Sequence, residues 1–165
     1  MTIMTNKLLH KYSVLFTILF YYHSYGQMVN KGSFFVSENT DVSIYENVTN
    51  KMSASINNNG NLYLFKDVDN SGQILFNSSK LTGTTLLVGN EVQKIYGNGS
   101  YQFLNLDINN ISTEFFSIQL ESKLDIYGDT YFIDGITQEM GNGIFNFQQN
   151  AQSFDDNDSS YANNL

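Results

Sequence analysis

The sequence predicts an all-β protein, and within that class a right-handed parallel β-solenoid of short coils with asparagine and glycine at their corners. Three observations predict it. Short β-prone runs alternate with clusters of Asn, Gly, Ser and Asp, and apolar and polar residues alternate strictly in Leu104–Ile108 and Ile118–Leu120. The region after residue 26 contains no amphipathic helical stretch. A small antiparallel β-sandwich is the alternative, because sandwiches also use short strands.

Each run predicted to be a strand is rich in leucine, β-branched or aromatic residues and is bounded by turn residues. In chain order these runs are Leu62–Phe65, Ile74–Phe76, Leu86–Val88, Phe103–Ile108, Phe115–Leu120, Leu124–Ile126, Tyr131–Ile133 and Ile144–Phe147.

The turn clusters between the runs resemble one another, and this favours a solenoid over a sandwich. The clusters are Asn57–Gly60, Asp69–Gly72, Gly97–Gly99, Asn109–Asn110 and Gly141–Gly143. Asn and Gly accept the left-handed backbone conformations that tight corners need, and stacked Asn side chains can hydrogen-bond between successive coils. Each short strand would then bury its apolar face against the coils above and below it.

Composition limits the classes of function. The 165 residues suffice for one domain, and the formal net charge is −8. The chain contains no cysteine, proline, tryptophan or arginine, so it offers neither a disulfide nor a bidentate guanidinium for phosphate. Because an acidic chain repels a nucleic-acid backbone, we expect no nucleic-acid partner.

Residues 1–26 are predicted to be a secretory signal peptide. Lys7, His10 and Lys11 form a basic region, and Val14–Tyr22 is an apolar run too short to span a bilayer comfortably. Small residues then precede a cleavage position before Gln27. The expected location is secreted, or on the outer cell surface without a membrane span after cleavage; an uncleaved N-terminal anchor is the alternative. Residues 27–154 are predicted to be the solenoid and 155–165 an acidic polar tail or a truncated continuation.

Cleavage would also remove both histidines, His10 and His23, together with two lysines, which changes the net charge to −8 − 2 = −10. The remaining chain could form neither a Ser–His or Cys–His nucleophilic pair nor a zinc site that uses imidazole or thiolate. We therefore predict no catalytic residue, no cofactor and no metal site.

One stretch resembles a unit of known surface proteins. It contains Ile95, Gly97, Gly99, Phe103, Asn105, Leu106 and Ile108–Asn110, in the pattern I-x-G-x-G…F-x-N-L-x-I-N-N. This pattern is similar to that of secreted, adhesin-like repeat proteins of Bacteroidetes-type bacteria. The flanking segments 58–72, 83–95 and 124–136 also resemble coils of that group, so the similarity covers about residues 54–161.

The resemblance implies a β-solenoid with an adhesin-like role. Two residues depart from the pattern: Thr130 stands where such units usually carry leucine, and Lys66 stands where glycine is common. Members of the group usually continue into a C-terminal sorting domain for type IX secretion, which is not seen before Leu165. We therefore expect either a short or truncated relative or a different route to the surface.

Two acidic segments are candidates for cation binding. Asp67–Gly72 begins like a calcium loop, but the twelfth position is Ser78 instead of a bidentate glutamate, so a solvated turn is expected. Asp155–Asp158 is acidic enough to attract a hard cation weakly and is expected to be a polar tail.

Paired carboxylates would allow a polysaccharide-acting hydrolase or lyase, for example Asp107 with Asp125 or Glu121 on neighbouring coils. The main expectation is instead that these carboxylates lie on ordinary solvent-facing positions. The sequons Asn47–Thr49 and Asn110–Ser112 are expected by chance in a chain so rich in asparagine.

Tyrosines could form a platform that stacks on sugar rings, or they could be ordinary strand aromatics. They are Tyr45, Tyr63, Tyr96, Tyr101, Tyr127 and Tyr131. The expected function is a secreted or cell-surface, non-catalytic adhesin-like protein. Expected partners are extracellular polysaccharide or another surface protein, and self-association through open solenoid ends is a further hypothesis. A carbohydrate-binding or polysaccharide-degrading module is the alternative function.

Overall fold

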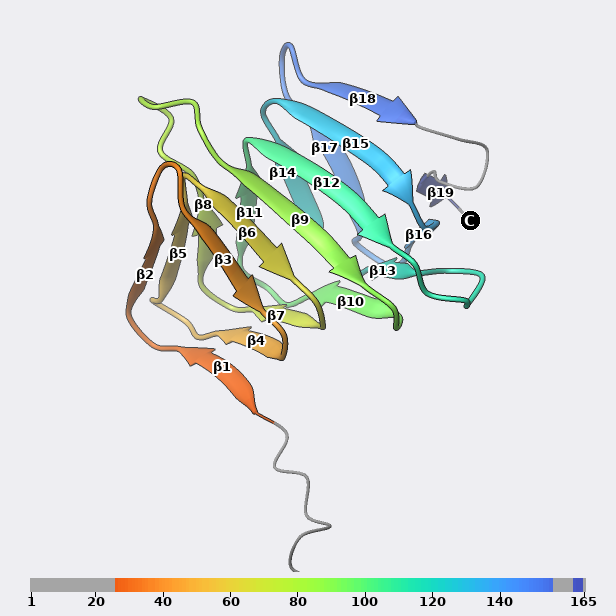
Figure 1. Cartoon of the computed structure of the whole chain (residues 1–165), viewed down its shortest axis with the longest axis horizontal. Helices are drawn as coiled ribbons and strands as arrows, with labels where there is room; N and C mark the ends of the chain where they lie inside the picture. The colour runs from red at the N-terminus through yellow and green to blue at the C-terminus, as the bar shows by residue number, and fades with distance from the viewer. Residues whose placement is uncertain (1–25, 156–161, 165) are drawn as a thin grey trace, which may run out of the picture.

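The computed structural model describes residues 26–155 and 162–164, and these residues form a parallel β-solenoid without a helix (Figure 1). Three sheets run along it, and every pairing between their strands is parallel. The predicted fold class is therefore confirmed, and the antiparallel sandwich is excluded. Most of the predicted signal peptide (1–25) and part of the predicted tail (156–161 and 165) lie outside the described residues.

Each sheet takes every third strand of the chain. Sheet A contains β1 (Gln27–Asn30), β4 (Asn47–Asn50), β7 (Val68–Asn70), β10 (Gln93–Tyr96), β13 (Ile118–Leu120), β16 (Thr137–Glu139) and β19 (Ala162–Asn164). Sheet B contains β2 (Ser33–Val36), β5 (Ser55–Asn58), β8 (Gln73–Leu75), β11 (Ser100–Phe103), β14 (Lys123–Ile126) and β17 (Ile144–Phe147). Sheet C contains β3 (Asp41–Ile44), β6 (Asn61–Leu64), β9 (Thr84–Gly89), β12 (Asn105–Asn110), β15 (Asp129–Asp134) and β18 (Gln152–Asp155).

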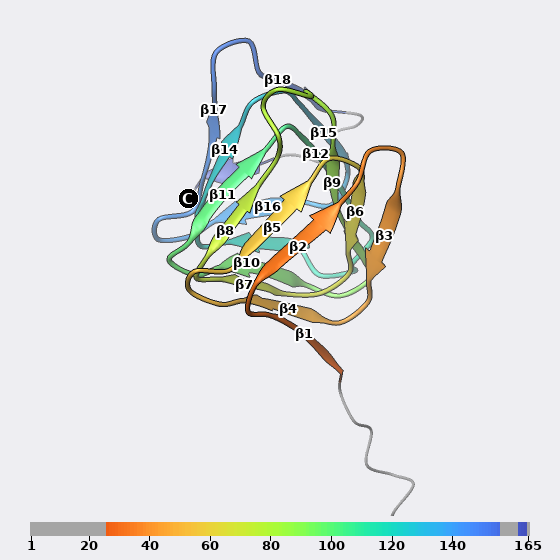
Figure 2. The same cartoon turned by 90° about the vertical axis from the view of Figure 1, so that its left-hand side faces the viewer.

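A coil consists of one strand from each sheet, so the cross-section is three-sided. Figure 2 views the molecule from the end that carries β1, β2 and β3, and there the chain runs clockwise as successive coils recede from the viewer. The solenoid is therefore right-handed, which is the usual hand of parallel crossover connections.

The core is a stack of inward-facing apolar rows, one row along each sheet. The rows are Val48, Val68, Ile95 and Leu120 on sheet A, Ile56, Ile74, Tyr101, Leu124 and Phe145 on sheet B, and Ile44, Leu64, Leu87, Ile108 and Phe132 on sheet C. All of these side chains are buried. Because strands alternate in and out, the outward-facing side chains of the same strands form parallel rows on the surface.

Asparagines stack inside one corner as the turn clusters predicted. The Asn30 amide nitrogen donates to the Asn50 side-chain oxygen at 2.9 Å, and the Asn50 amide donates to the Asn70 side-chain oxygen at 2.8 Å. The Asn70 amide ends the ladder by donating to the Ser100 carbonyl at 2.8 Å. In the next coil Gly97 lies against the Asn70 backbone, where no further Asn side chain would fit.

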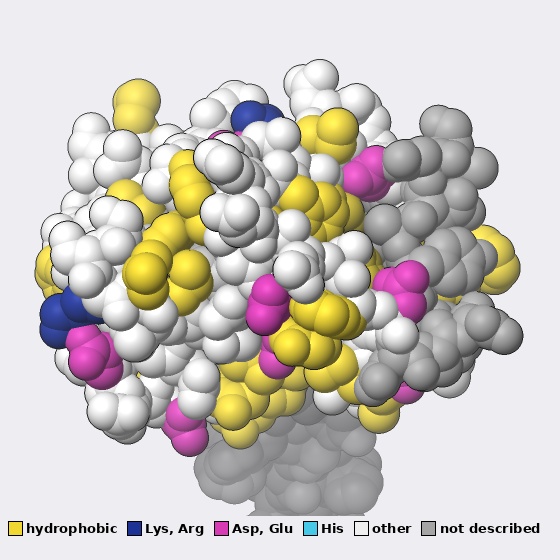
Figure 3. Space-filling model, turned by 90° about the horizontal axis from the view of Figure 1, so that it is seen from above, with side chains coloured by type: hydrophobic (Ala, Val, Ile, Leu, Met, Phe, Trp, Pro, Cys, Tyr) yellow, Lys and Arg dark blue, Asp and Glu magenta, His cyan; other side chains and the backbone are white. Residues whose placement is uncertain are grey.

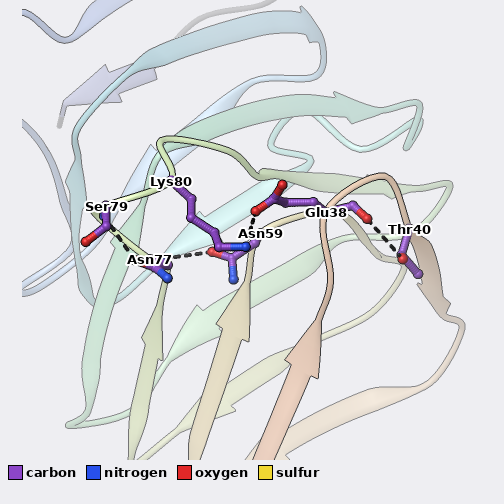
Figure 4. A network of polar contacts seen from close by, with 6 residues as sticks. All are labelled: Glu38, Thr40, Asn59, Asn77, Ser79 and Lys80. Atoms are coloured by element: carbon purple, nitrogen blue, oxygen red, sulfur yellow. Dashed lines mark hydrogen bonds and ion pairs between the residues drawn. The ribbon is translucent and has the colours of Figure 1, made fainter.

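A second set of polar contacts joins three coils at the corner between sheets B and C (Figure 4). Lys80, from the long connection between β8 and β9, forms an ion pair with Glu38 of the first coil. The Asn77 backbone N–H donates to the Asn59 side-chain oxygen at 2.8 Å, and the Ser79 N–H donates to Asn77 at 3.0 Å. Because the Lys80 and Glu38 side chains are largely exposed, this ion pair adds little stability, and the backbone contact holds the connection in place.

Two of the predicted strands, Phe103–Ile108 and Phe115–Leu120, differ most from the observed elements. Phe103–Ile108 is not one strand, because the chain turns at Leu104 between β11 and β12. In Phe115–Leu120 only the last three residues form a strand, and Phe115 lies in a connection with 67% of its surface exposed. The strands before Leu62 were not predicted, because runs such as NVTN and SINN place asparagine on inward positions that a hydrophobic pattern does not detect.

Thr130, which stands where similar repeat units carry leucine, occupies a core position in β15. It pairs with Leu106 of β12 and Ser153 of β18. Its hydroxyl is buried and has no hydrogen-bond partner among the described residues, and the same holds for the hydroxyl of Thr137. A buried hydroxyl without a partner costs stability relative to an apolar group of the same shape. We therefore expect the core of the coil that contains Thr130 to contribute less stability than the cores of the neighbouring coils.

Candidate functional site

The outward face of sheet C carries an aromatic row that crosses the coils. The strand register places Ser43, Tyr63, Leu86, Asp107, Tyr131 and Phe154 in this row. Tyr131 and Phe154 stack with ring centroids 4.9 Å apart and 14° between the ring planes. The surface seen from above the view of Figure 1 carries several hydrophobic patches, and acidic side chains lie beside some of them (Figure 3). An exposed row of this kind is suited to contact with a partner that has apolar and polar edges.

A groove of about 550 Å³ lies at the ends of β6, β9 and β12 on the same face. Tyr63 and Phe65 provide aromatic lining, Val88 and Ile111 provide aliphatic lining, and the polar lining consists of Gly89 and the amides of Asn90 and Asn109. We call this volume the sheet C groove, and none of the described residues that line it is charged. Phe65 also stacks on Tyr45, with centroids 4.4 Å apart.

A second, smaller groove of about 360 Å³ lies near the corner between sheets B and C. Phe76, Leu81 and Tyr127 give it an apolar lining, and the Phe76 and Tyr127 rings meet edge to face at 5.3 Å.

The tyrosines do not form one platform. Tyr63 and Tyr131 share the outward row of sheet C, and Tyr45 borders that sheet. Tyr127 lies in the smaller groove, and Tyr96 lies at the end of β10 on sheet A. Tyr101 is 1% exposed and belongs to the core, where its hydroxyl donates to the Tyr96 carbonyl at 2.6 Å. Burial raises the pKa of Tyr101, so its hydroxyl stays protonated as a structural donor.

The carboxylates proposed as a catalytic pair do not come together. Asp107 is on sheet C, Asp125 is on sheet B, and Glu121 lies in the corner after β13. Asp107 is half-buried between Leu86 and Tyr131, and this burial raises the pKa of its carboxyl group. The hypothesis of a pair formed across neighbouring coils is therefore wrong.

Asp125 is held by its neighbours on sheet B. Its carboxylate forms an ion pair with Lys123 at 2.8 Å and accepts hydrogen bonds from the Asn146 and Gln148 amides. Burial alone would raise the pKa of Asp125, but the Lys123 hydrogen bond and charge, with the two amides, lower it overall. The Asp125 carboxylate is therefore ionised, and its contacts with Lys123, Asn146 and Gln148 are typical of a structural role.

The calcium-like segment Asp67–Gly72 is not a loop. Val68–Asn70 form strand β7, so the predicted solvated turn is wrong for these residues. The Asp67 side chain accepts the Lys94 backbone N–H at 2.8 Å, and Asn70 points into the corner ladder. Within residues 26–155 and 162–164, no group of three or more Asp, Glu, His or Cys could hold a metal ion. Of Asp155–Asp158, only Asp155 is described; it ends β18 and is exposed.

The asparagine of each sequon lies in a strand. Asn47 is exposed at the start of β4, whereas Asn110 is fully buried and donates to Glu91 and Gln93. Asn110 is therefore a corner residue that no enzyme could reach in the folded chain.

The sequence did not predict that the groove residues Phe65, Gly89, Asn90, Asn109 and Ile111 form a site.

No protein-family model matches the chain, and no curated protein and no solved structure is found to be similar to it. In the part of the chain that the structure describes, no helix is long and apolar enough to cross a membrane. We therefore infer a function from the surface of the solenoid.

Proposed function

We propose that this protein is a secreted or cell-surface structural protein with an adhesin-like role and no catalytic activity. The observation that carries the proposal is the outward face of sheet C, where Tyr63, Leu86, Tyr131 and Phe154 share one row on a stacked scaffold. The partner would be an extracellular polysaccharide or another surface protein. It would be held by many weak contacts spread along the coils, whose combined strength exceeds that of each contact.

A polysaccharide-degrading module is the second candidate, because Asp107 is a half-buried carboxyl group with a raised pKa beside exposed aromatic rings. Groups with such properties are enriched at catalytic sites. A glycoside hydrolase would need a second carboxylate opposite the first, and the two that the sequence offered lie elsewhere. The position of Asp107 therefore favours a role in binding a partner over a role in polysaccharide cleavage.

The full chain, produced with its N-terminal segment in an exporting bacterial host, is expected to appear outside the cell with Gln27 at its new N-terminus, as read by mass spectrometry. Beads coated with this product should be retained on extracted extracellular polysaccharide or on cell surfaces. Replacing both Tyr131 and Phe154 with serine should reduce retention about threefold or more, because many weak contacts act together. Phe35→Ser, at an exposed site on sheet B, is the matched control.

The same preparation should release no new reducing ends from the polysaccharides. Polysaccharide turnover that Asp107→Asn abolishes would contradict the non-catalytic role and support the second candidate. Retention equal to that of uncoated beads, together with a product that stays inside the cell, would contradict the adhesin-like role.

Self-association is part of the same proposal. Among the described strands, β1, β2 and β3 lie at one end of their sheets and β17, β18 and β19 at the other. Each of these strands has one strand neighbour only, and such edges can pair with another chain. Because opposite ends of two molecules would meet, the contact is head to tail and need not close into a ring.

Sedimentation velocity is expected to show species larger than a monomer that increase with protein concentration. Val29→Lys places a charge on the exposed edge strand β1 and should shift the distribution towards monomer. Met52→Lys, at an exposed position away from the edge strands, should leave the distribution unchanged. A strict monomer over a wide concentration range would contradict self-association.

A further inference from the structure

We propose that the sheet C groove is a binding site for an uncharged glycan, and this inference rests on the adhesin-like function proposed above. The ligand class is a neutral polysaccharide that lays the apolar face of a sugar ring on Tyr63 or Phe65. Its hydroxyl groups would hydrogen-bond to the amides of Asn90 and Asn109. Four features of the groove support this assignment: the aromatic wall, the free amides, the local backbone and the charge.

The aromatic wall is held in place before any ligand arrives. Phe65 follows β6 directly, and its backbone N–H donates to the Ile44 carbonyl of the preceding coil at 3.1 Å. Its ring stacks on Tyr45 of that coil and also lines the groove. Tyr63 lines the groove two residues earlier, from an outward position of the same strand. A fixed aromatic surface loses little conformational freedom on binding, which suits stacking on a sugar ring.

The two amides in the groove are free to bind a ligand. Asn90 and Asn109 are exposed, and neither side chain forms a hydrogen bond with the described residues. Other asparagines in this protein, such as Asn50 and Asn110, use their amides to join coils. An amide presents both donors and an acceptor, so each can pair with hydroxyl groups in either sense.

The backbone of the groove departs from the regular coil at Gly89. The pairing of β12 with β9 is regular and places Asn109 opposite Val88, so both residues reach the groove from the ends of adjacent strands. The slip between Ile108 and Asn109 lies on the other edge of β12, towards β15, and none of the described groove residues is on β15. Gly89 has a φ of +148°, and a Cβ there would lie 2.9 Å from the Phe65 carbonyl oxygen. Part of the groove surface is therefore bare backbone, which leaves space for a ligand.

Charge selects among polysaccharides. The groove lining contains no lysine, and the chain carries 16 acidic residues against 8 basic ones. Glu91 follows Asn90 in the sequence and Asp134 pairs with Asn109, so two acidic residues are neighbours of lining residues. Lys66, which follows Phe65, forms an ion pair with Glu46. An anionic glycan such as a polyuronate would be repelled, whereas a neutral glycan would meet no such penalty.

The test is binding of the full exported chain to soluble neutral polysaccharides, namely a glucan, a mannan and a galactan, with polygalacturonate and alginate as anionic probes. Affinity electrophoresis should show retardation by at least one neutral polymer and none by the anionic polymers. Asn90→Ala combined with Asn109→Ala should weaken this binding about tenfold, because two hydrogen bonds to the ligand are lost. Tyr63→Ser should also weaken binding, and Tyr63→Phe should retain it because the ring remains.

Asn142→Ala makes the same chemical change at an exposed asparagine of another corner and should leave affinity unchanged. Thermal unfolding of each variant verifies that the fold is intact. Binding to anionic polymers alone, binding to a peptide alone, or binding that the groove variants leave unaltered would overturn the inference. If beads still adhere while neutral polymers neither bind nor compete, the adhesin-like role stands and only the glycan assignment fails.

Discussion

Gly97→Ala is expected to lower the free energy of unfolding by about 3 kcal/mol or more, since backbone strain and overpacking each contribute. Gly97 has a φ of +113°, which L side chains rarely adopt. A Cβ at this residue would lie 2.2 Å from the Asn70 carbonyl oxygen and 2.7 Å from the Asn70 carbonyl carbon. These atoms belong to the backbone of the preceding coil, so they cannot rotate away. The new methyl group would therefore push two coils apart.

Urea unfolding, followed by the change in far-ultraviolet circular dichroism, measures this loss. Gly141→Ala separates the two causes, because Gly141 has a φ of +60° but a Cβ there would meet no atom within 4 Å. Its expected cost is about 1 kcal/mol, from the left-handed conformation alone. Gly32→Ala has neither a positive φ nor a clash and should be neutral. Equal stability of Gly97→Ala and Gly32→Ala would contradict the tight stacking of coils at this corner.

Asn50→Ala is expected to lower the free energy of unfolding by about 2–4 kcal/mol, because buried polar groups lose their partners. Asn50 is fully buried in the middle of the corner ladder. Its side chain accepts from Asn30 and donates to the Asn70 oxygen and to the Gln73 carbonyl at 3.0 Å. Alanine cannot make any of these contacts. The loss would fall on three successive coils at once.

Asn47→Ala is the matched control, since Asn47 begins the same strand β4 and is exposed. Its expected effect is within about 0.5 kcal/mol, as for most surface substitutions. Both variants should be compared by the midpoint of urea unfolding and by its slope. If Asn50→Ala unfolds at the same urea concentration as Asn47→Ala, the ladder contributes nothing measurable to stability.

The candidate site was only partly predictable. Tyr63 and Tyr131 were identified as possible sugar-stacking residues, but so was Tyr101, which the structure places in the core. Tyr63 and Tyr131 lie in predicted strands and Tyr101 lies just before one, and the hydropathy of a single tyrosine does not tell which side of a strand it occupies. Phe65 and Asn109 were not identified, because nothing in the sequence brings these two residues to one groove.

The catalytic-pair hypothesis failed for a related reason. Asp107 and Asp125 both follow a leucine on an alternating strand, so each was predicted to face solvent, and each does. They nevertheless lie on sheets C and B, which face different directions around the three-sided coil. Alternation determines whether a residue faces inward or outward, but it does not say on which of three sides the residue lies.

Period-two alternation and turn chemistry are local properties of the chain, so they predicted the all-β class and favoured a solenoid with Asn-rich corners over a sandwich. They did not predict which residues are neighbours, because strand pairing joins residues at unequal separations that depend on the tertiary structure. Val68 pairs with Ile95, a separation of 95 − 68 = 27, whereas Ile118 pairs with Thr137, a separation of 137 − 118 = 19. Because the coils differ in length, sequence spacing does not give the rows of residues on the surface. The packing of the inward side chains sets these rows, and it also brings together the residues of the sheet C groove.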